Sequence, residues 1–439
     1  MTRCMEHSSR MIQRYIMRRH GWSCQSRMKK REAAMDIRKI LEIDEIYDLQ
    51  KKLAEIMPHK HLREEYFDRI IANGADIKRD FIRDIYQEEA AQRKQLKQDY
   101  TPSSLCDLFF HIANPDKNEP FLDECAGTGS LAIAFISNGC QNCVCVEKSS
   151  TVFIMLLFNL TIRNISGYAI RQDILTGSVA EIFRLTRGDK YSDIQKTDIL
   201  PDNRFLTAVS NPPYSLGWSG TPDIRTEGWG TPPKSKADYM FVLDIMHRLG
   251  SRGSAYVLLP HGVLFRNNTE ALIRQQLVCS GYLNAVIGLP DNMFMNTQIP
   301  VVMLCLSKIK SNDVWIADFS RYAVRQGKVN ALENEKIHEI AEACHKRQYI
   351  QKTARRVPLE EIRKNEFNLN IPRYIDTFEP EELPDVRELV KSILDTDREI
   401  RETEIKIARM MQELTGEDYR NIFGEVMQLW NSADTAGRK

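Results

Sequence analysis

The sequence lacks a strong charge of either sign and lacks any long apolar run. Its 439 residues carry 61 lysines and arginines against 60 aspartates and glutamates, a formal net charge of +1. No overall field therefore draws the chain to a polyanion, and any contact with nucleic acid must come from local patches or a partner. The longest apolar stretch, residues 152–160, is broken by Asn159. It is too short to span a bilayer, so we expect no membrane association.

The sequence also lacks a secretory signal and a recognisable set of metal ligands. Ten cysteines without such a signal indicate a reducing cytoplasm. Cys140, Cys143 and Cys145 lie close together, but no second pair completes a ligand set, and Cys143 and Cys145 alternate along an expected strand. We therefore interpret them as buried thiols and expect no metal site.

Length and composition are typical of a globular protein with more than one domain. Hydrophobic residues make up 42% and charged residues 28% of the chain, and this length predicts two or three domains. Residues 1–34 differ from the rest, because positions 1–32 hold nine lysines and arginines against two acids. Such a start can be an organelle-targeting peptide or a nucleic-acid arm. We favour a disordered basic leader, translated upstream of a start at Met28 or Met35.

Residues 35–95 are expected to form a small helical domain. Apolar side chains recur at spacings of three and four residues from Ile46 to Met57, and Pro58 ends that helix. A second helix is predicted over residues 62–73, where Asn73-Gly74 gives a stop signal. A third includes residues 81–86.

Residues 96–376 alternate between strand and helix patterns. This alternation predicts an α/β domain with a doubly wound, mostly parallel sheet. The expected strands cover residues 121–122, 144–146, 205–209, 255–259, 285–287 and 301–306, and the expected helices cover residues 105–112, 131–136, 237–249 and 271–277. A loop rich in glycine, tryptophan and proline, residues 215–235, is a candidate lid or substrate clamp.

Residues 123–129 follow the first of these strands with the sequence Asp-Glu-Cys-Ala-Gly-Thr-Gly. A strand, a glycine turn and a helix open a dinucleotide-type βαβ unit. Gly127 and Gly129 allow the backbone to approach a ligand where a side chain would collide. The turn is not Gly-x-Gly-x-x-Gly, and no Lys-Ser/Thr follows it, which weakens nicotinamide and nucleoside-triphosphate interpretations.

Two further acids stand at expected strand ends. Glu147 can accept both ribose hydroxyls of a nucleoside, although a surface ion pair with Lys148 is the alternative. Asp173 can accept a hydrogen bond from the adenine amine of the same ligand. The alternative is that Asp173 caps the N-terminus of a helix.

The tetrapeptide Asn211-Pro212-Pro213-Tyr214 ends the strand at residues 205–209. Two prolines cannot continue a sheet ladder, so the backbone turns there. The Asn211 side-chain oxygen and the Pro212 carbonyl can accept from an exocyclic amine, and the Tyr214 ring can stack on the heterocycle that carries it. Asn-Pro-Pro is also a plain turn, but its occurrence after the glycine motif favours a site for methylating a nucleobase amine or a planar amide.

Residues 377–439 are expected to form a C-terminal helical region. Apolar residues recur at intervals of seven, at Val386, Ile393, Ile400, Ile407 and Leu414. Sustained heptads favour packing of helix on helix, either within the chain or with a partner.

The motifs together resemble the adenine-N6 branch of the DNA amino-methyltransferases. Residues 259–266, 288–294 and 368–374 narrow the resemblance to the modification subunit of type I restriction–modification systems, and the match covers roughly residues 96–376. Glu124 and Cys125-Ala126 replace the Pro and Ala-Cys that the family usually has, and Tyr214 is often Phe there.

The resemblance implies S-adenosylmethionine as the cofactor. The residues that it assigns to this cofactor are Tyr100, Thr101, Pro102, Asp123, Ala126, Gly127, Thr128, Gly129, Glu147, Asp173 and Asn211. It assigns the binding of the target adenine to Asn211, Pro212, Pro213 and Tyr214.

The implied activity is that of a site-specific, adenine-specific DNA methyltransferase in the cytoplasm of a prokaryote. The implied partners are double-stranded DNA with a flipped adenine, a specificity subunit and, as a further candidate, a restriction subunit. The alternatives are a methyltransferase acting on a protein glutamine or on RNA, and a non-enzymatic, cofactor-binding scaffold in a restriction complex. Cytosine C5 chemistry needs a thiol nucleophile, and no Pro-Cys pair occurs in the chain.

Overall fold

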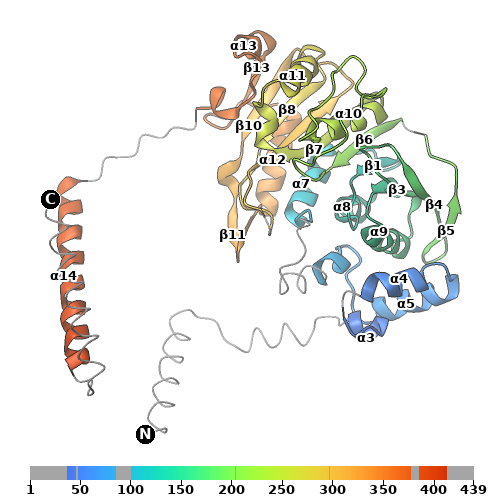
Figure 1. The fold of residues 1–439 in the computed structure, drawn as a ribbon, viewed down its shortest axis with the longest axis horizontal. Coiled ribbons are helices and arrows are strands. Elements are labelled where there is room, and N and C mark those ends of the chain that lie inside the picture. The colour runs from blue at the N-terminus through green and yellow to red at the C-terminus, as the bar shows by residue number, and fades with distance from the viewer. Residues whose placement is uncertain are drawn as a thin grey trace, which may run out of the picture. The chain divides into compact units, whose positions relative to one another are not determined.

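The computed structural model describes residues 37–45, 48–85, 100–202, 204–295, 297–376 and 385–412. The chain divides into two compact units with the boundary between residues 377 and 378. The larger unit holds the sheet and the helices around it (Figure 1). The predicted leader, residues 1–34, lies outside the described residues, and the predicted domain limits at residues 35–95, 96–376 and 377–439 stay predictions.

One sheet of eleven strands forms the centre of the larger unit, in the order β13-β10-β8-β9-β7-β6-β1-β2-β3-β4-β5. Five neighbouring strands, β7-β6-β1-β2-β3, are parallel to one another, and antiparallel pairs flank them on both sides. The strands are β1 (Phe121–Glu124), β2 (Asn142–Glu147), β3 (Ser166–Gln172), β4 (Val179–Arg187), β5 (Ser192–Thr197), β6 (Phe205–Ser210), β7 (Leu249–Pro260), β8 (Leu283–Gly288), β9 (Val301–Ser307), β10 (Asp313–Asp318) and β13 (Ala354–Pro358), and a separate hairpin joins β11 (Val324–Gln326) to β12 (Val329–Ala331).

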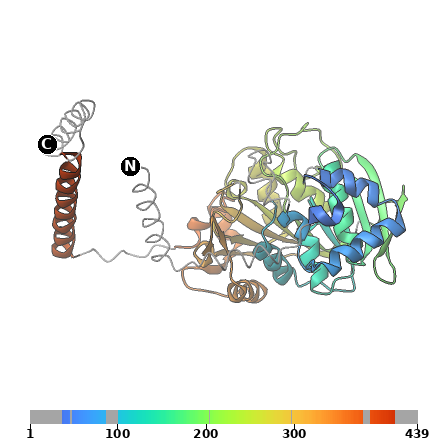
Figure 2. The ribbon, with the colours of Figure 1, turned by 90° about the horizontal axis from the view of Figure 1, so that it is seen from below.

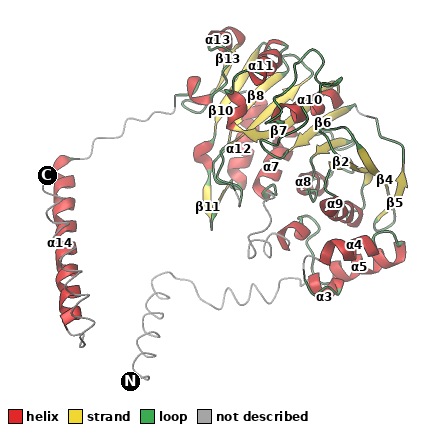
Figure 3. Cartoon of the chain, viewed as in Figure 1, coloured by secondary structure: helices red, strands yellow, loops and turns green. Residues whose placement is uncertain are grey.

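Helices cover both faces of this sheet (Figure 3). Alternate residues of a strand point to opposite faces, and Phe121 and Leu122 of β1 accordingly belong to two separate hydrophobic clusters. The first face packs against α7 (Ser103–Ala113), α8 (Ser130–Ser137), α9 (Ser150–Ile162) and α12 (Asn334–Lys346), and the second packs against α10 (Asp238–Arg248), α11 (Thr269–Cys279) and α13 (Leu359–Lys364). Short 3-10 helices are η2 (His261–Leu264), η3 (Ser320–Tyr322) and η4 (Ile371–Arg373).

The predicted doubly wound α/β fold is thus confirmed, and its parallel centre includes four of the six expected strands, β1, β2, β6 and β7. Several elements were not predicted, among them α9, α12, β10, β13 and the β4–β5 hairpin. The hairpin and β13 escaped prediction because their burial alternates or is sparse and their sequences are rich in charged residues. The apolar stretch at residues 152–160 is the buried helix α9, which packs on β2 and β3.

The N-terminal helices belong to the same compact unit as the sheet. They are α3 (Ile37–Leu41), α4 (Leu49–Ile56) and α5 (Lys60–Ala72), and residues 81–85 are also helical. Leu53 and Phe67 are fully buried in the cluster that contains α9, and α4 packs directly on that helix (Figures 1 and 2). The predicted helices are therefore present, and they extend the core of the larger unit.

The described part of the smaller unit is a single helix, α14 (Val386–Gln412), of 27 residues. Its heptad positions Val386, Ile393, Ile400 and Ile407 are between 41% and 71% exposed, whereas Leu414 lies outside the described residues. Apolar side chains at this spacing and exposure form a stripe along one side of the helix. Within the described ranges, no helix is long and apolar enough to cross a membrane.

Candidate active site

The carboxyl ends of β1, β2 and β6 lie side by side. Glu124, the last residue of β1, stands opposite Val146 of β2 and Ser210 of β6. The chain leaves β1 toward β2 and β3 on one side and returns to β6 and β7 on the other, so the strand order reverses at β1. Ligands of open α/β sheets bind at such a reversal. The fold therefore brings the glycine motif and the Asn-Pro-Pro-Tyr motif to one edge.

Residues 125–129, called the glycine turn from here on, connect β1 to α8. Cys125, Gly127 and Gly129 have φ angles of 63°, 59° and 94°. A Cβ atom at Gly129 would lie 2.9 Å from Leu156, whereas one at Gly127 would meet nothing within 4 Å. The φ of 94° and the closeness of Leu156 both favour glycine at position 129, and the backbone at Gly127 faces open space that a ligand can occupy.

Glu147 connects the end of β2 to the glycine turn. Its Oε2 accepts from the Gly127 amide at 3.0 Å, and its Oε1 accepts from the Ser149 amide at 2.7 Å. Burial raises the pKa of this carboxyl, and these backbone donors act in the opposite direction. A carboxylate has about four acceptor positions, so Glu147 keeps capacity for a ligand hydroxyl.

Asp173 follows the end of β3 and makes two local contacts. Its Oδ1 accepts from the Leu175 amide at 3.0 Å, and its Oδ2 lies 2.9 Å from Lys148 Nζ. Lys148 thus pairs with Asp173, while the Glu147 oxygens bind the backbone. The Leu175 contact closes a turn over residues 174–176, which is the kind of local role that was the alternative for Asp173.

Asp123 lies beneath the glycine turn. The side chain is fully buried, and its Oδ2 accepts from the Ala132 amide at 3.0 Å, in the first turn of α8. Burial raises the pKa of Asp123 to about 8. Among the described residues, its Oδ1 has no hydrogen-bond partner. Asp123 therefore shapes the turn from inside the fold.

The Asn211 amide is hydrogen-bonded at both ends. Its Nδ2 donates to Thr101 Oγ1 at 2.9 Å, and its Oδ1 accepts from the Tyr214 hydroxyl at 2.7 Å. Pro212 is buried and Pro213 is exposed. The contact with Thr101 orients the amide so that its oxygen lies on the side of Tyr214.

The Tyr214 ring packs edge to face on Phe294, with ring centroids 6.2 Å apart. The next residue is also fixed, because the Ser215 amide donates to the buried Asp238 at 2.7 Å. Arg266 donates to the other oxygen of Asp238 at 2.5 Å. Phe294 and Arg266 lie in two of the stretches on which the family resemblance rests, and the structure places both around the tetrapeptide.

Tyr100, Thr101 and Pro102 lead into α7. Tyr100 and Thr101 are buried, and Pro102 precedes the first helical residue. The Thr101 carbonyl accepts from Arg83 Nη1 at 2.7 Å. The hydroxyl of Thr101 thus contacts the tetrapeptide, and its carbonyl contacts the N-terminal helical region.

Thr128 and Ser130 turn their hydroxyls toward the N-terminal helical region. Both donate to Asp80 Oδ2, at 2.5 Å and 2.7 Å. Thr128 is fully buried, so its side chain points away from the open side of the turn, and Ala126 is also buried. Asp80 was missed by sequence reasoning, because it lies 48 and 50 residues from these partners and no local pattern marks it.

Buried charges also anchor the loop at residues 215–235. Arg225 donates to Asp244 Oδ1 at 2.7 Å and to the Ile174 carbonyl at 2.5 Å. Arg248 donates to the other Asp244 oxygen at 2.5 Å. Burial beside Asp244 raises the pKa of Glu124 well above its usual range. The middle of the loop is therefore attached to α10 behind the carboxyl end of β1.

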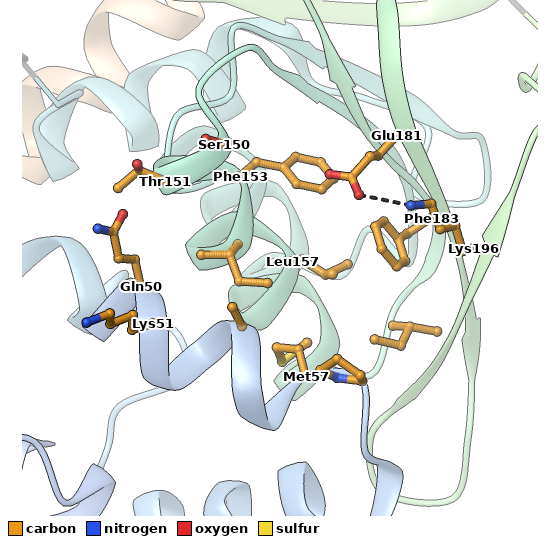
Figure 4. A pocket seen from close by; sticks show the side chains of 14 residues that line it. Gln50, Lys51, Met57, Ser150, Thr151, Phe153, Leu157, Glu181, Phe183 and Lys196 are labelled. Carbon is orange, nitrogen blue, oxygen red and sulfur yellow. Dashed lines mark hydrogen bonds and ion pairs between the residues drawn. The ribbon is translucent and has the colours of Figure 1, made fainter. Parts of the chain in front are cut away.

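A cavity of about 650 Å³ lies between α4, α9 and the β4–β5 hairpin (Figure 4). None of the predicted site residues lines it. Its walls are Gln50, Lys51, Ala54, Met57, Pro58, Ser150, Thr151, Phe153, Ile154, Leu157, Glu181, Phe183, Ile194 and Lys196. In the described part of the chain, no group of three or more His, Cys, Asp or Glu side chains is placed to hold a metal ion.

Comparison with known proteins adds three relatives. A methylase subunit of the type I restriction enzyme MpnII from Mycoplasma pneumoniae is 29% identical over 351 residues, which are 74% of this chain and 62% of the relative. The MjaVIII methylase subunit from Methanocaldococcus jannaschii is 25% identical over 343 residues, 72% of this chain and 56% of the relative. The chain thus spans about three fifths of the length of these two relatives.

A crystal structure of a type I restriction–modification methyltransferase subunit from Streptococcus thermophilus has the same fold. It superimposes with a TM-score of 0.58 at 28% identity, covering 77% of this chain and 75% of that one. The family model described as N-6 DNA Methylase matches residues 78–383, which include the glycine turn, Glu147 and the Asn-Pro-Pro-Tyr tetrapeptide. The chain belongs to the N-6 DNA methylase family.

Proposed function

We propose that this protein transfers a methyl group from S-adenosylmethionine to N6 of adenine in DNA, as the modification subunit of a type I restriction–modification system. The observation that carries the proposal is the position of the Asn211 amide at the end of β6, beside the glycine turn that follows β1. The relatives are named as methylase subunits of type I restriction enzymes, which favours DNA over the protein and RNA alternatives.

The residues present fit the proposed cofactor. The Gly127 backbone faces open space, and Glu147 stands beside it with acceptor capacity for ribose hydroxyls. Asp173 would lie toward the adenine end, and Thr101 would contact the cofactor from the side of α7. When bound, S-adenosylmethionine supplies an electrophilic methyl group, which the adenine amine takes with loss of a proton.

The chain's own residues would hold the amine and the base. A target adenine must first leave the duplex, at a cost of a few kcal/mol. Stacking on the Tyr214 ring returns roughly 1–3 kcal/mol. Asn211 Oδ1 and the Pro212 carbonyl would accept hydrogen bonds from the two N6–H groups, which localises the lone pair on the nitrogen. The rate enhancement comes from the preorganised acceptors and from the orientation of the amine toward the methyl group. The reaction needs no covalent enzyme intermediate.

Two measurements test this function. Sequencing of host DNA with and without the gene should show N6-methyladenine only when the gene is present. In the complex with its specificity subunit, Asn211→Ala should abolish methylation while S-adenosylmethionine still binds, as measured by calorimetry. Methylation by this variant at the parent rate would contradict the role that we propose for Asn211.

A further inference from the structure

Asp80 is a buried carboxylate that receives four hydrogen bonds behind the glycine turn. Its Oδ2 accepts from Thr128 and Ser130, and its Oδ1 accepts from Asn159 Nδ2 at 2.9 Å and from the Arg83 amide at 3.0 Å. The same Asn159 nitrogen donates to the Thr128 carbonyl at 2.8 Å. One side chain from outside the βαβ unit therefore fixes the C-terminal end of the turn and the first residue of α8.

Arg83 extends this contact to the other half of the site. Its Nη1 donates to the Thr101 carbonyl, and the Thr101 hydroxyl accepts from Asn211. Residues 80–83, called the 80–83 clamp from here on, thus touch the glycine turn at one end and the support of the Asn211 amide at the other.

The glycine turn needs such a support because its backbone is costly to order. Cys125 holds a φ of 63°, a conformation that side-chain-bearing residues rarely adopt. A turn that is already ordered in the folded protein loses little conformational entropy when it binds its ligand. A turn that becomes ordered only on binding loses that entropy then, and its affinity is lower. Charged acceptors make the stronger hydrogen bonds, which suits a carboxylate to this task.

We propose that Asp80 is a positioning residue for the methyl donor, and that the 80–83 clamp aligns the two halves of the active site. The inference rests on the proposed function, since it takes the glycine turn to be the S-adenosylmethionine site. Asp80 acts through Thr128 and Ser130 and need not touch the cofactor.

The deciding experiment compares Asp80→Asn with Asp68→Asn in the full chain, by calorimetry with S-adenosylmethionine. Asp68 is a matched control, because it also joins the helical region to the sheet, through Lys190 and Tyr191 at 2.6 Å and 2.5 Å, without reaching the glycine turn. Asp80→Asn should raise the Kd about tenfold, the equivalent of one hydrogen bond to a charged group. Asp68→Asn should keep the parent Kd. Equal affinity of Asp80→Asn and parent would overturn the proposal.

Two more variants keep the test decisive if Asp80→Asn does not fold. Thr128→Val removes one donor to Asp80 and should weaken cofactor binding in the same direction. Where Asp80→Asn does fold, the effect of the two changes together should be less than additive. Arg83→Met should lower kcat several-fold in the subunit complex, with a smaller effect on the cofactor Kd than Asp80→Asn has. Parent affinity in Thr128→Val would overturn the role of Asp80. A parent chain that binds no S-adenosylmethionine would instead refute the proposed function.

Discussion

The Tyr214 hydroxyl donates a hydrogen bond to Asn211 Oδ1, 2.7 Å away. This is the oxygen that the proposed mechanism reserves for the adenine amine. The hydroxyl occupies one of the two acceptor positions of this oxygen and leaves the other for an N6–H group. The same bond holds the tyrosine ring beside Asn211.

Tyr214→Phe should keep most of the methylation rate, because stacking needs the ring and not the hydroxyl. Tyr214→Ala should lose about 1–3 kcal/mol of stacking, or roughly 5- to 150-fold in kcat/KM. Steady-state methylation of a duplex by the subunit complex measures both. A Tyr214→Phe variant as inactive as Tyr214→Ala would show that the hydroxyl itself is required.

Glu147→Ala should weaken S-adenosylmethionine binding by on the order of 1.5–3 kcal/mol, the usual loss for a charge-assisted hydrogen bond. The affinity of the parent should also fall as the pH falls through the pKa of Glu147, because the carboxylate is the accepting form and burial has raised that pKa. Calorimetry across a pH series measures both effects. Unchanged affinity in a folded Glu147→Ala variant would place the cofactor elsewhere.

Asp123 should make the protein less stable as the pH rises from about 4 toward 8. Its folded pKa of about 8 lies above the ordinary value of 3.8, so the folded state binds the proton more tightly than the unfolded state. The stabilising effect is complete below the unfolded pKa and is lost as the pH rises through the folded one.

Asp123→Asn should remove this dependence, because an amide oxygen can still accept from Ala132 but carries no charge. Urea unfolding at pH 6 and pH 8.5 should show a drop of more than about 1 kcal/mol in the parent and a smaller one in the variant. Equal drops in both proteins would assign the pH dependence to another group.

Replacement of Ile393, Ile400 and Ile407 by aspartate should abolish co-purification with a specificity subunit, if the exposed stripe of α14 is the contact surface. The control variant changes Lys391, Arg398 and Arg401 to aspartate. These residues lie off the heptad positions, and their replacement changes the net charge more than replacement of the three isoleucines does. Cofactor binding should survive in both. A triple variant of the stripe that still assembles would exclude α14 as the contact.

The parts of the site that sequence reasoning found are those encoded locally. The apolar run at residues 205–209 followed by two prolines marks the end of β6, and the run before Asp123 marks the end of β1. Asp80, Phe294 and Asp238 could not be assigned in this way, because their roles depend on which side chains the fold brings to them. The polar hairpin β4–β5 was missed because a strand with little burial has no alternating apolar pattern.

The position of β1 between β2 and β6 also bears on biosynthesis. Asp80, the glycine turn and Glu147 come from one continuous part of the chain that precedes Phe205, whereas β1 pairs with β6 only once that later strand has emerged. The N-terminal part of the chain is synthesised first. The residues of the glycine-turn half of the proposed site are therefore present before the Asn-Pro-Pro-Tyr tetrapeptide, and until β6 pairs with it β1 has an unpaired edge to which another strand can add.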